Sequence, residues 1–71
     1  MSEQNFGKNL KDLRTGGNKF GKKYSQKDVS IATGISRSLI SEYENQIKEP
    51  TLSAIIKIAE FFDVSLDELC L

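Results

Sequence analysis

The sequence predicts an all-α fold, a compact bundle of about five short helices. Apolar residues recur at three- and four-residue spacing in several separate segments, which is the period of a helix with one buried face. Serine or threonine stands where most of these segments begin, and glycine or proline follows where several of them end. No segment alternates apolar and polar residues as a half-buried strand does.

The first expected helix spans residues 5–14, where Phe6, Leu10 and Leu13 share one face. Residues 15–24 follow with three glycines and three lysines and with no helical period. This composition predicts a loop, which is long for a connection inside a small helical domain.

Two short helices, residues 25–33 and 36–45, are expected to meet across Gly34. Ser25 and Asp28 form the pattern of a capping box, in which each side chain accepts a hydrogen bond from the other residue's backbone amide. Gly34 stands where the end of a helix needs a left-handed conformation that other residues adopt only at a cost. The sequence therefore predicts two helices joined by a tight turn.

The main core helix is expected to begin at Thr51, because Pro50 blocks continuation of the preceding helix and threonine caps the next one. A second capping box over residues 65–68 predicts a last short helix that buries Leu66 and Leu69. The expected buried stripe of the main core helix consists of Leu52, Ile55, Ile56, Ala59 and Phe62.

Length and composition narrow the functional classes. The 71 residues allow a single domain, residues 1–71, and Cys70 is the only cysteine in a chain without histidine. An intrachain disulfide, a zinc-type ligand set and a Ser-His or Cys-His nucleophile pair are therefore all excluded. We expect no catalytic residue, no metal and no cofactor, and hence a protein that is not an enzyme.

The amino-terminal stretch lacks the apolar run of a signal peptide. No segment approaches the roughly 18 apolar residues that a membrane span needs. The expectation is a cytoplasmic protein with no membrane partner.

The formal net charge of +0 hides an uneven distribution of charge along the chain. Residues 8–48 carry nine lysines and arginines against four acidic residues, whereas residues 49–71 carry one lysine against five acidic residues. A basic segment of about +5 is typical of a surface that binds nucleic acid, and random scatter over a solvated surface is the alternative.

Motifs spread over nearly the whole chain resemble those of a known family. They are Phe6-Gly7, Leu10, Leu13-Arg14, SQKDV from Ser25, GISRS from Gly34, ISEYE from Ile40, Glu49-Pro50-Thr51-Leu52, Ala59 and DVSLDEL from Asp63. Together they resemble the Xre/Cro-repressor type of helix-turn-helix DNA-binding protein, whose fold is lambda-repressor-like. The resemblance implies a prokaryotic or phage transcriptional regulator that binds specific double-stranded DNA, with the helix over residues 36–45 in the major groove.

The resemblance also assigns roles to individual residues. Arg37 has the chemistry to read guanine, with a contact to phosphate alone as the alternative. Glu42 has the chemistry to read cytosine, with a solvated helix position as the alternative. Arg14 and Glu44 match a family pair and are expected to form a structural ion pair. The base-facing positions are Arg37, Ser38, Leu39 and Glu42, and the phosphate-facing positions are Gln26, Lys27, Ser36, Ser41, Asn45 and Lys48.

The chain departs from the family pattern in its loop and at single positions. The loop over residues 15–24 is about five residues longer than the resemblance implies. Phe20 in this loop is expected to fold over Ile31, which stands where the family keeps a polar residue. Gln46 replaces a glycine after the reading helix, where a positive φ is unfavourable for other residues. The loop lysines are candidates for contacts to flanking phosphates, with a solvated loop as the alternative, and they are Lys19, Lys22 and Lys23.

A single reading helix contacts few base pairs, so we expect a homodimer that reads two half-sites about 34 Å apart. The resemblance places the dimer interface near the last two helices, at Phe61, Leu69 and Leu71, with packing on the domain's own core as the alternative. The favoured function is a repressor that occupies its operator and takes no small-molecule ligand. The alternative is an antitoxin-like interaction module for which DNA binding is secondary.

Overall fold

The all-α prediction is confirmed. The computed structural model describes residues 5–70, and within them it has five α-helices, one π-helical turn and no strand. None of these helices is long and apolar enough to cross a membrane. The elements are α1 (Asn5–Asp12), the π-helical turn Leu13–Gly17 that continues it, α2 (Gln26–Thr33), α3 (Arg37–Glu44), α4 (Leu52–Phe62) and α5 (Leu66–Cys70).

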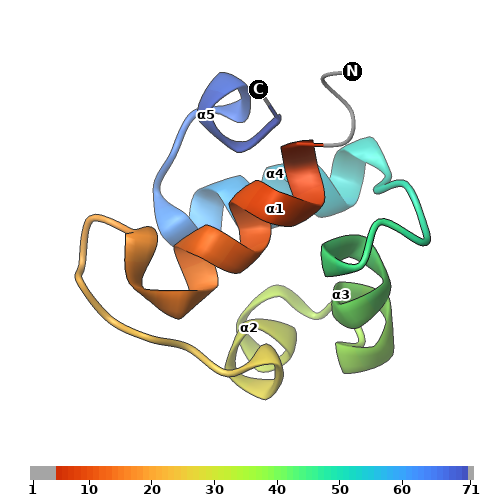
Figure 1. The fold of residues 1–71 in the computed structure, drawn as a ribbon, viewed down its shortest axis with the longest axis horizontal. Helices are drawn as coiled ribbons and strands as arrows, with labels where there is room; N and C mark the ends of the chain where they lie inside the picture. Colours follow the sequence, from red (N-terminus) through yellow and green to blue (C-terminus); the bar gives the residue numbers. More distant parts are fainter. Residues whose placement is uncertain (1–4, 71) are drawn as a thin grey trace.

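In the view of Figure 1, α1 lies in front of α4 near the middle, and the other three helices lie around them. α2 and α3 lie together at the lower edge of this view, and α5 lies at the upper edge. α1 packs against α3 and α5, while α2 packs against α3 and α4. The long loop after the π-helical turn runs down one side and leads into α2, so α2 and α3 form an edge of their own.

The core draws apolar side chains from all five helices. Leu10, Ile40 and Leu69 come from α1, α3 and α5 and are completely buried. Phe6 packs edge-on against Tyr43, with ring centroids 5.7 Å apart, and thereby joins α1 to α3. The other buried apolar residues are Val29, Ile35, Ala54, Ile58, Ala59 and Phe62.

Side-chain caps begin four of the helices where the sequence predicted them. At α2 the Ser25 hydroxyl accepts from the Asp28 amide and the Asp28 carboxylate accepts from the Ser25 amide, both at 3.0 Å. The same reciprocal pair of bonds opens α5 at residues 65–68. Ser36 and Thr51 cap α3 and α4 with one bond each, both of 3.1 Å. These bonds satisfy amides that have no partner inside their own helix.

Three helices end on a residue with positive φ. Gly34 after α2 has φ 76°, as the sequence predicted. Gln46 after α3 has φ 60° and Asp63 after α4 has φ 56°, so these two turns are built without glycine. In both, the amide one residue further on donates to the carbonyl five positions back, at 2.9 and 3.0 Å, which closes the helix end.

The predicted buried stripe of α4 is wrong at two positions. Leu52 is 66% exposed and Ile56 39% exposed, and Leu66 of α5, also expected inside, is 44% exposed. The reason is that α4 is apolar at almost every position, so its period does not decide which face turns inward. The face that packs on the core consists of Ala54, Ile58, Ala59 and Phe62.

Candidate nucleic-acid interface

A shallow concavity between α2 and α3 gathers polar side chains of complementary chemistry. α2 contributes Gln26 from its first turn, and α3 contributes Arg37, Ser38, Ser41 and Glu42. The guanidinium and the amide donate hydrogen bonds, the carboxylate accepts them, and the hydroxyls do both. A surface with both kinds of group matches the mixed donors and acceptors of base edges.

The orientation of α3 follows from its buried face. Ile40 and Tyr43 point into the core, so Arg37 and Ser38 lie on the outside and are exposed. Leu39 differs from the expectation, because it is half-buried and packs against the core cluster. We therefore assign Leu39 to packing rather than to base contact.

The Arg14 guanidinium and the Glu44 carboxylate form a two-pronged ion pair, as the resemblance implied. Nε lies 2.6 Å from Oε2 and Nη2 lies 2.9 Å from Oε1. The side chains are 14% and 4% exposed respectively, so the pair is largely shielded from water. The hydrogen bond that Arg14 donates to the Glu44 carboxylate raises the pKa of Arg14 above its ordinary value, so the guanidinium stays charged.

This ion pair also braces the start of α2. The Gln26 amide donates to Glu44 Oε1 at 3.2 Å, and Arg14 Nη1 donates to the Tyr24 carbonyl at 3.1 Å. The end of α1, the loop before α2, and α3 therefore share one hydrogen-bonded network. No local pattern in the sequence marks Tyr24, because it joins the network through its backbone.

The other expected phosphate contacts lie around the concavity. Lys27, Ser36 and Asn45 are exposed and Ser41 is half-buried. The Asn45 amide donates weakly to the Ser41 hydroxyl at 3.4 Å, one helical turn back. These groups remain accessible at both ends of α3.

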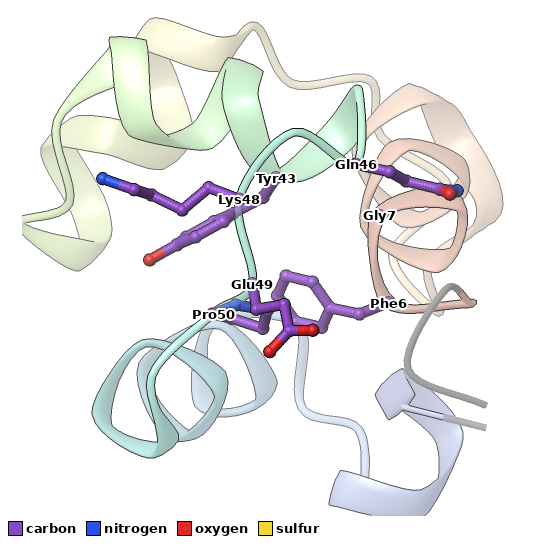
Figure 2. Close-up of a pocket in the computed structure, with 7 residues that line it drawn as sticks. All are labelled: Phe6, Gly7, Tyr43, Gln46, Lys48, Glu49 and Pro50. Atoms are coloured by element: carbon purple, nitrogen blue, oxygen red, sulfur yellow. The ribbon is translucent and has the colours of Figure 1, made fainter. Parts of the chain in front are cut away.

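Lys48 is exposed in the connection from α3 to α4, beside a small cavity of about 180 Å³. Figure 2 shows its side chain running along the Tyr43 ring, with the ammonium on the same side as the Tyr43 hydroxyl. The cavity sits where α1 meets the end of α3, and a Cβ on Gly7 would overlap the Tyr43 carbonyl oxygen. Close helix contact therefore explains Gly7. The lining residues are Phe6, Gly7, Tyr43, Gln46, Lys48, Glu49 and Pro50.

The three loop lysines have different surroundings. Lys19 Nζ lies 2.8 Å from Asp63 Oδ2, in an exposed ion pair with the end of α4. Lys22 and Lys23 are exposed on the part of the loop that leads into α2. The structure thus directs one lysine toward α4 and leaves two beside α2.

Comparison with known proteins decides the family. A family model described as helix-turn-helix matches residues 19–69, which include all of α2 to α4 and most of α5. The chain belongs to the Xre-type helix-turn-helix family. It is accordingly a DNA-binding transcriptional regulator. No curated protein sequence matches it.

The helix-turn-helix protein is also similar to a solved structure, that of the restriction-modification controller protein C.AhdI from Aeromonas hydrophila. The TM-score is 0.78 and the sequence identity 28%. The match covers 96% of this chain and 94% of the other. The two proteins therefore share their fold over nearly their whole lengths.

The residues expected at a dimer interface are placed differently by the structure. Leu69 is completely buried in the core of its own helix-turn-helix domain, so its assignment to an interface is wrong. The reason is that α5 folds back on α1, where the Asn9 amide donates to the Leu69 carbonyl at 2.9 Å. Phe61 is half-buried against Tyr24, with ring centroids 5.1 Å apart. Leu71 lies outside the described residues.

Other apolar side chains remain exposed on the helix-turn-helix protein. Phe20 and Ile31 are 51% and 73% exposed, so the expected packing of one over the other is wrong. The loop instead folds around the buried Asn18, which turns Phe20 outward. Leu52, Ile56 and Leu66 form the exposed apolar part of α4 and α5.

Proposed function

We propose that this protein binds a specific double-stranded DNA operator as a homodimer and represses transcription by occupying it. The observation that carries the proposal is the concavity between α2 and α3, which presents Arg37 and Glu42 together. Neither side chain has an ion-pair partner among residues 5–70, so their hydrogen-bonding groups are free for bases. We also infer that the protein acts by binding alone, without catalysis.

In this proposal Arg37 donates two hydrogen bonds to guanine O6 and N7, and Glu42 accepts one from cytosine N4. Ser38 bonds to an adjacent base edge. Glu42 lies five positions after Arg37, which is a rise of about 7.5 Å along α3 and roughly two base-pair steps of DNA. A good bidentate contact favours the correct base by about 1–3 kcal/mol, so Arg37 contributes most to sequence preference.

Contacts to phosphate would then set the register of α3 in the groove. Gln26 uses one N–H for Glu44 and keeps its second N–H for phosphate, while the Arg14–Glu44 pair fixes its position. The first amides of α2 point the same way and favour an anion. The remaining phosphate contacts in the proposal are made by Lys27, Ser36, Ser41, Asn45 and Lys48.

A second copy of the chain would cover the exposed apolar part of α4 and α5. Leu52 and Ile56 are four residues apart on one face of α4, and Leu66 stands at the start of α5. Large apolar side chains that remain exposed on so small a protein are candidates for an interaction site. Dimerisation would place two reading helices on successive major grooves, about 34 Å apart.

The test is selection of bound sequences from a random duplex pool by the unmodified protein, Arg37→Ala and Lys57→Ala. Lys57 is an exposed cation on α4, outside the concavity, and serves as the matched control. We expect enrichment of a two-fold symmetric site that loses one base preference in Arg37→Ala and none in Lys57→Ala. Absence of enrichment, or binding indifferent to sequence, would overturn the proposal and favour an antitoxin-like interaction module.

A further inference from the structure

We propose that Lys22 and Lys23 of the long loop bind phosphates of the DNA backbone beside α2, and that Lys19 does not. This inference rests on the DNA binding proposed above and extends the contact surface beyond the two motif helices. It concerns the part of the chain that is longer than the family resemblance implies.

The loop is held from inside by one buried amide. Asn18 Nδ2 donates to the carbonyls of Leu13 and Lys22, both at 2.7 Å. Asn18 Oδ1 accepts from the amides of Phe20 and Lys22 at 2.9 and 3.4 Å. The backbone of Lys22 is therefore bonded to Asn18 through both its N–H and its C=O.

A second set of contacts fixes the loop two residues later. The Tyr24 amide donates to the Arg14 carbonyl at 2.7 Å, and the Tyr24 carbonyl accepts from Arg14 Nη1 at 3.1 Å. The Tyr24 ring packs on Phe61 and Phe62, with centroids 5.1 and 6.0 Å away. Lys23 thus lies between two anchored residues. Ordering a residue's backbone costs conformational entropy, and here that ordering precedes contact with DNA.

The two lysines stand close to the expected phosphate-binding end of α2. Lys23 lies two residues before the N-cap Ser25 and three before Gln26, the first residue of α2. Three peptide units span at most about 11 Å, so the Cα atoms of Lys23 and Gln26 lie within that distance. Both side chains are exposed, and neither pairs with a carboxylate among the described residues. Asp28, the nearest acidic residue in sequence, already accepts from the Ser25 amide. Two free cations are therefore added to the anion-attracting end of a helix.

Lys19 differs from both in direction and in partner. Its ammonium binds the Asp63 carboxylate, which stands at the end of α4 rather than beside α2. A contact between Lys19 and phosphate would first have to break this pair. The structure therefore divides three lysines that look equivalent in the sequence.

The experiment measures the salt dependence of binding to a long mixed-sequence duplex. The slope of log K against log salt is negative, and each phosphate contact that is lost makes it less steep by about 0.9. We expect the double variant Lys22→Gln, Lys23→Gln to make the slope less steep by about 1.8 per protomer. The matched control Lys19→Gln should leave the slope unchanged, and Lys22→Arg with Lys23→Arg should retain it.

An unchanged slope in the double glutamine variant would overturn the inference, and so would an equal loss in Lys19→Gln. Because phosphate contacts do not depend on sequence, this result is separate from the pool selection. If Arg37→Ala loses a base preference while the loop variant keeps its slope, the proposed function stands and the inference about the loop lysines is wrong. Circular dichroism of each variant checks whether the fold is intact. We expect it to be intact, because all three lysines are exposed.

Discussion

Glu44 is the carboxylate on which three separate segments of the chain converge. It receives two hydrogen bonds from Arg14 and one from Gln26, and its side chain is almost completely buried. A buried carboxylate needs such partners, because its solvation by water is lost. The residue therefore connects the stability of the domain to the placement of Gln26 at the proposed DNA surface.

Replacing Arg14 by alanine should lower the free energy of unfolding by about 3 kcal/mol, because it leaves the buried Glu44 carboxylate without its main partner. Urea unfolding measures the change. The matched control is Lys19→Ala, which breaks an exposed pair and should cost about 0.5 kcal/mol. Equal effects of the two variants would show that the Arg14 pair contributes no more than a surface pair.

Tyr43 makes the domain sensitive to alkaline pH. Burial raises the pKa of Tyr43 above its ordinary value of 10.0; the Thr51 amide opposes this shift and the Glu42 charge adds to it. Burial also raises the pKa of Cys70 above 9.0. In each case the unfolded chain ionises first, so the stabilisation is intact below the unfolded pKa and is lost as pH rises through the folded pKa.

We therefore expect the unfolding free energy to fall between about pH 8 and pH 11, with a smaller fall in Tyr43→Phe. Urea unfolding at a series of pH values measures both slopes. The phenylalanine variant starts about 1 kcal/mol lower, because it loses the hydroxyl's hydrogen bond. Identical pH slopes in the two proteins would contradict this role for Tyr43.

At the scale of elements, the two helix-ending turns without glycine make the free energy of unfolding lower than glycine at the same positions would. Gln46 ends α3 in the left-handed region, where a side chain is disfavoured by about 1–2 kcal/mol. The hydrogen bonds that close the turn come from the backbone and do not need the glutamine side chain. The position is therefore tolerated rather than optimal.

Gln46→Gly should raise the free energy of unfolding by about 1 kcal/mol, since glycine adopts the same φ without strain. Thermal or urea unfolding is the measurement. Gln46→Ala is the matched control, because it removes the side chain and keeps the strain, and it should give no gain. A gain of equal size in the alanine variant would place the unfavourable interaction in the side chain instead.

Helix starts and ends were predictable from the sequence because their chemistry is local. The hydrogen bonds between Ser25 and Asp28 join residues three positions apart. The preference for glycine at position 34 depends only on the positive φ of that residue. The family resemblance likewise assigned a partner to Arg14 that the structure bears out, because the motif carries both residues.

Contacts made across the fold were not predictable in the same way. The apolar positions of α4 fit two faces, and only the packing of α2 and α5 against α4 decides between them. Leu66 and Leu69 are equally apolar, but the fold buries one and exposes the other. The pairing of Lys19 with Asp63 joins residues 44 positions apart and follows no sequence period.

At the scale of the whole molecule, charge is divided between two ends of the chain. The basic excess lies in residues 8–27, which carry seven lysines and arginines against one acidic residue, whereas residues 49–71 carry one lysine against five acidic residues. The loop that leads into α2, beside the proposed DNA surface, is therefore basic, whereas the proposed dimer surface lies on an acidic segment. Two acidic ends would repel each other at long range, so apolar contacts have to hold a dimer together.

Ile56→Glu should convert the proposed homodimer to a monomer, because it adds another negative charge to an apolar contact on an acidic segment. Sedimentation equilibrium over a range of protein concentrations measures the change. Ile31→Glu is the matched control, since Ile31 is also exposed but lies on α2. Dissociation by the Ile31 variant alone would move the interface to α2.

The strained ends of α3 and α4 also affect the concentration of this protein in a cell. A domain of this size has a small margin of stability, and a smaller margin leaves a larger unfolded fraction open to proteolysis. Glycine at Gln46 lies outside the proposed reading face, so it should lengthen the protein's lifetime and leave its sequence preference unchanged. A single turn residue therefore changes the steady-state concentration of the regulator without changing the DNA sequence that the protein prefers.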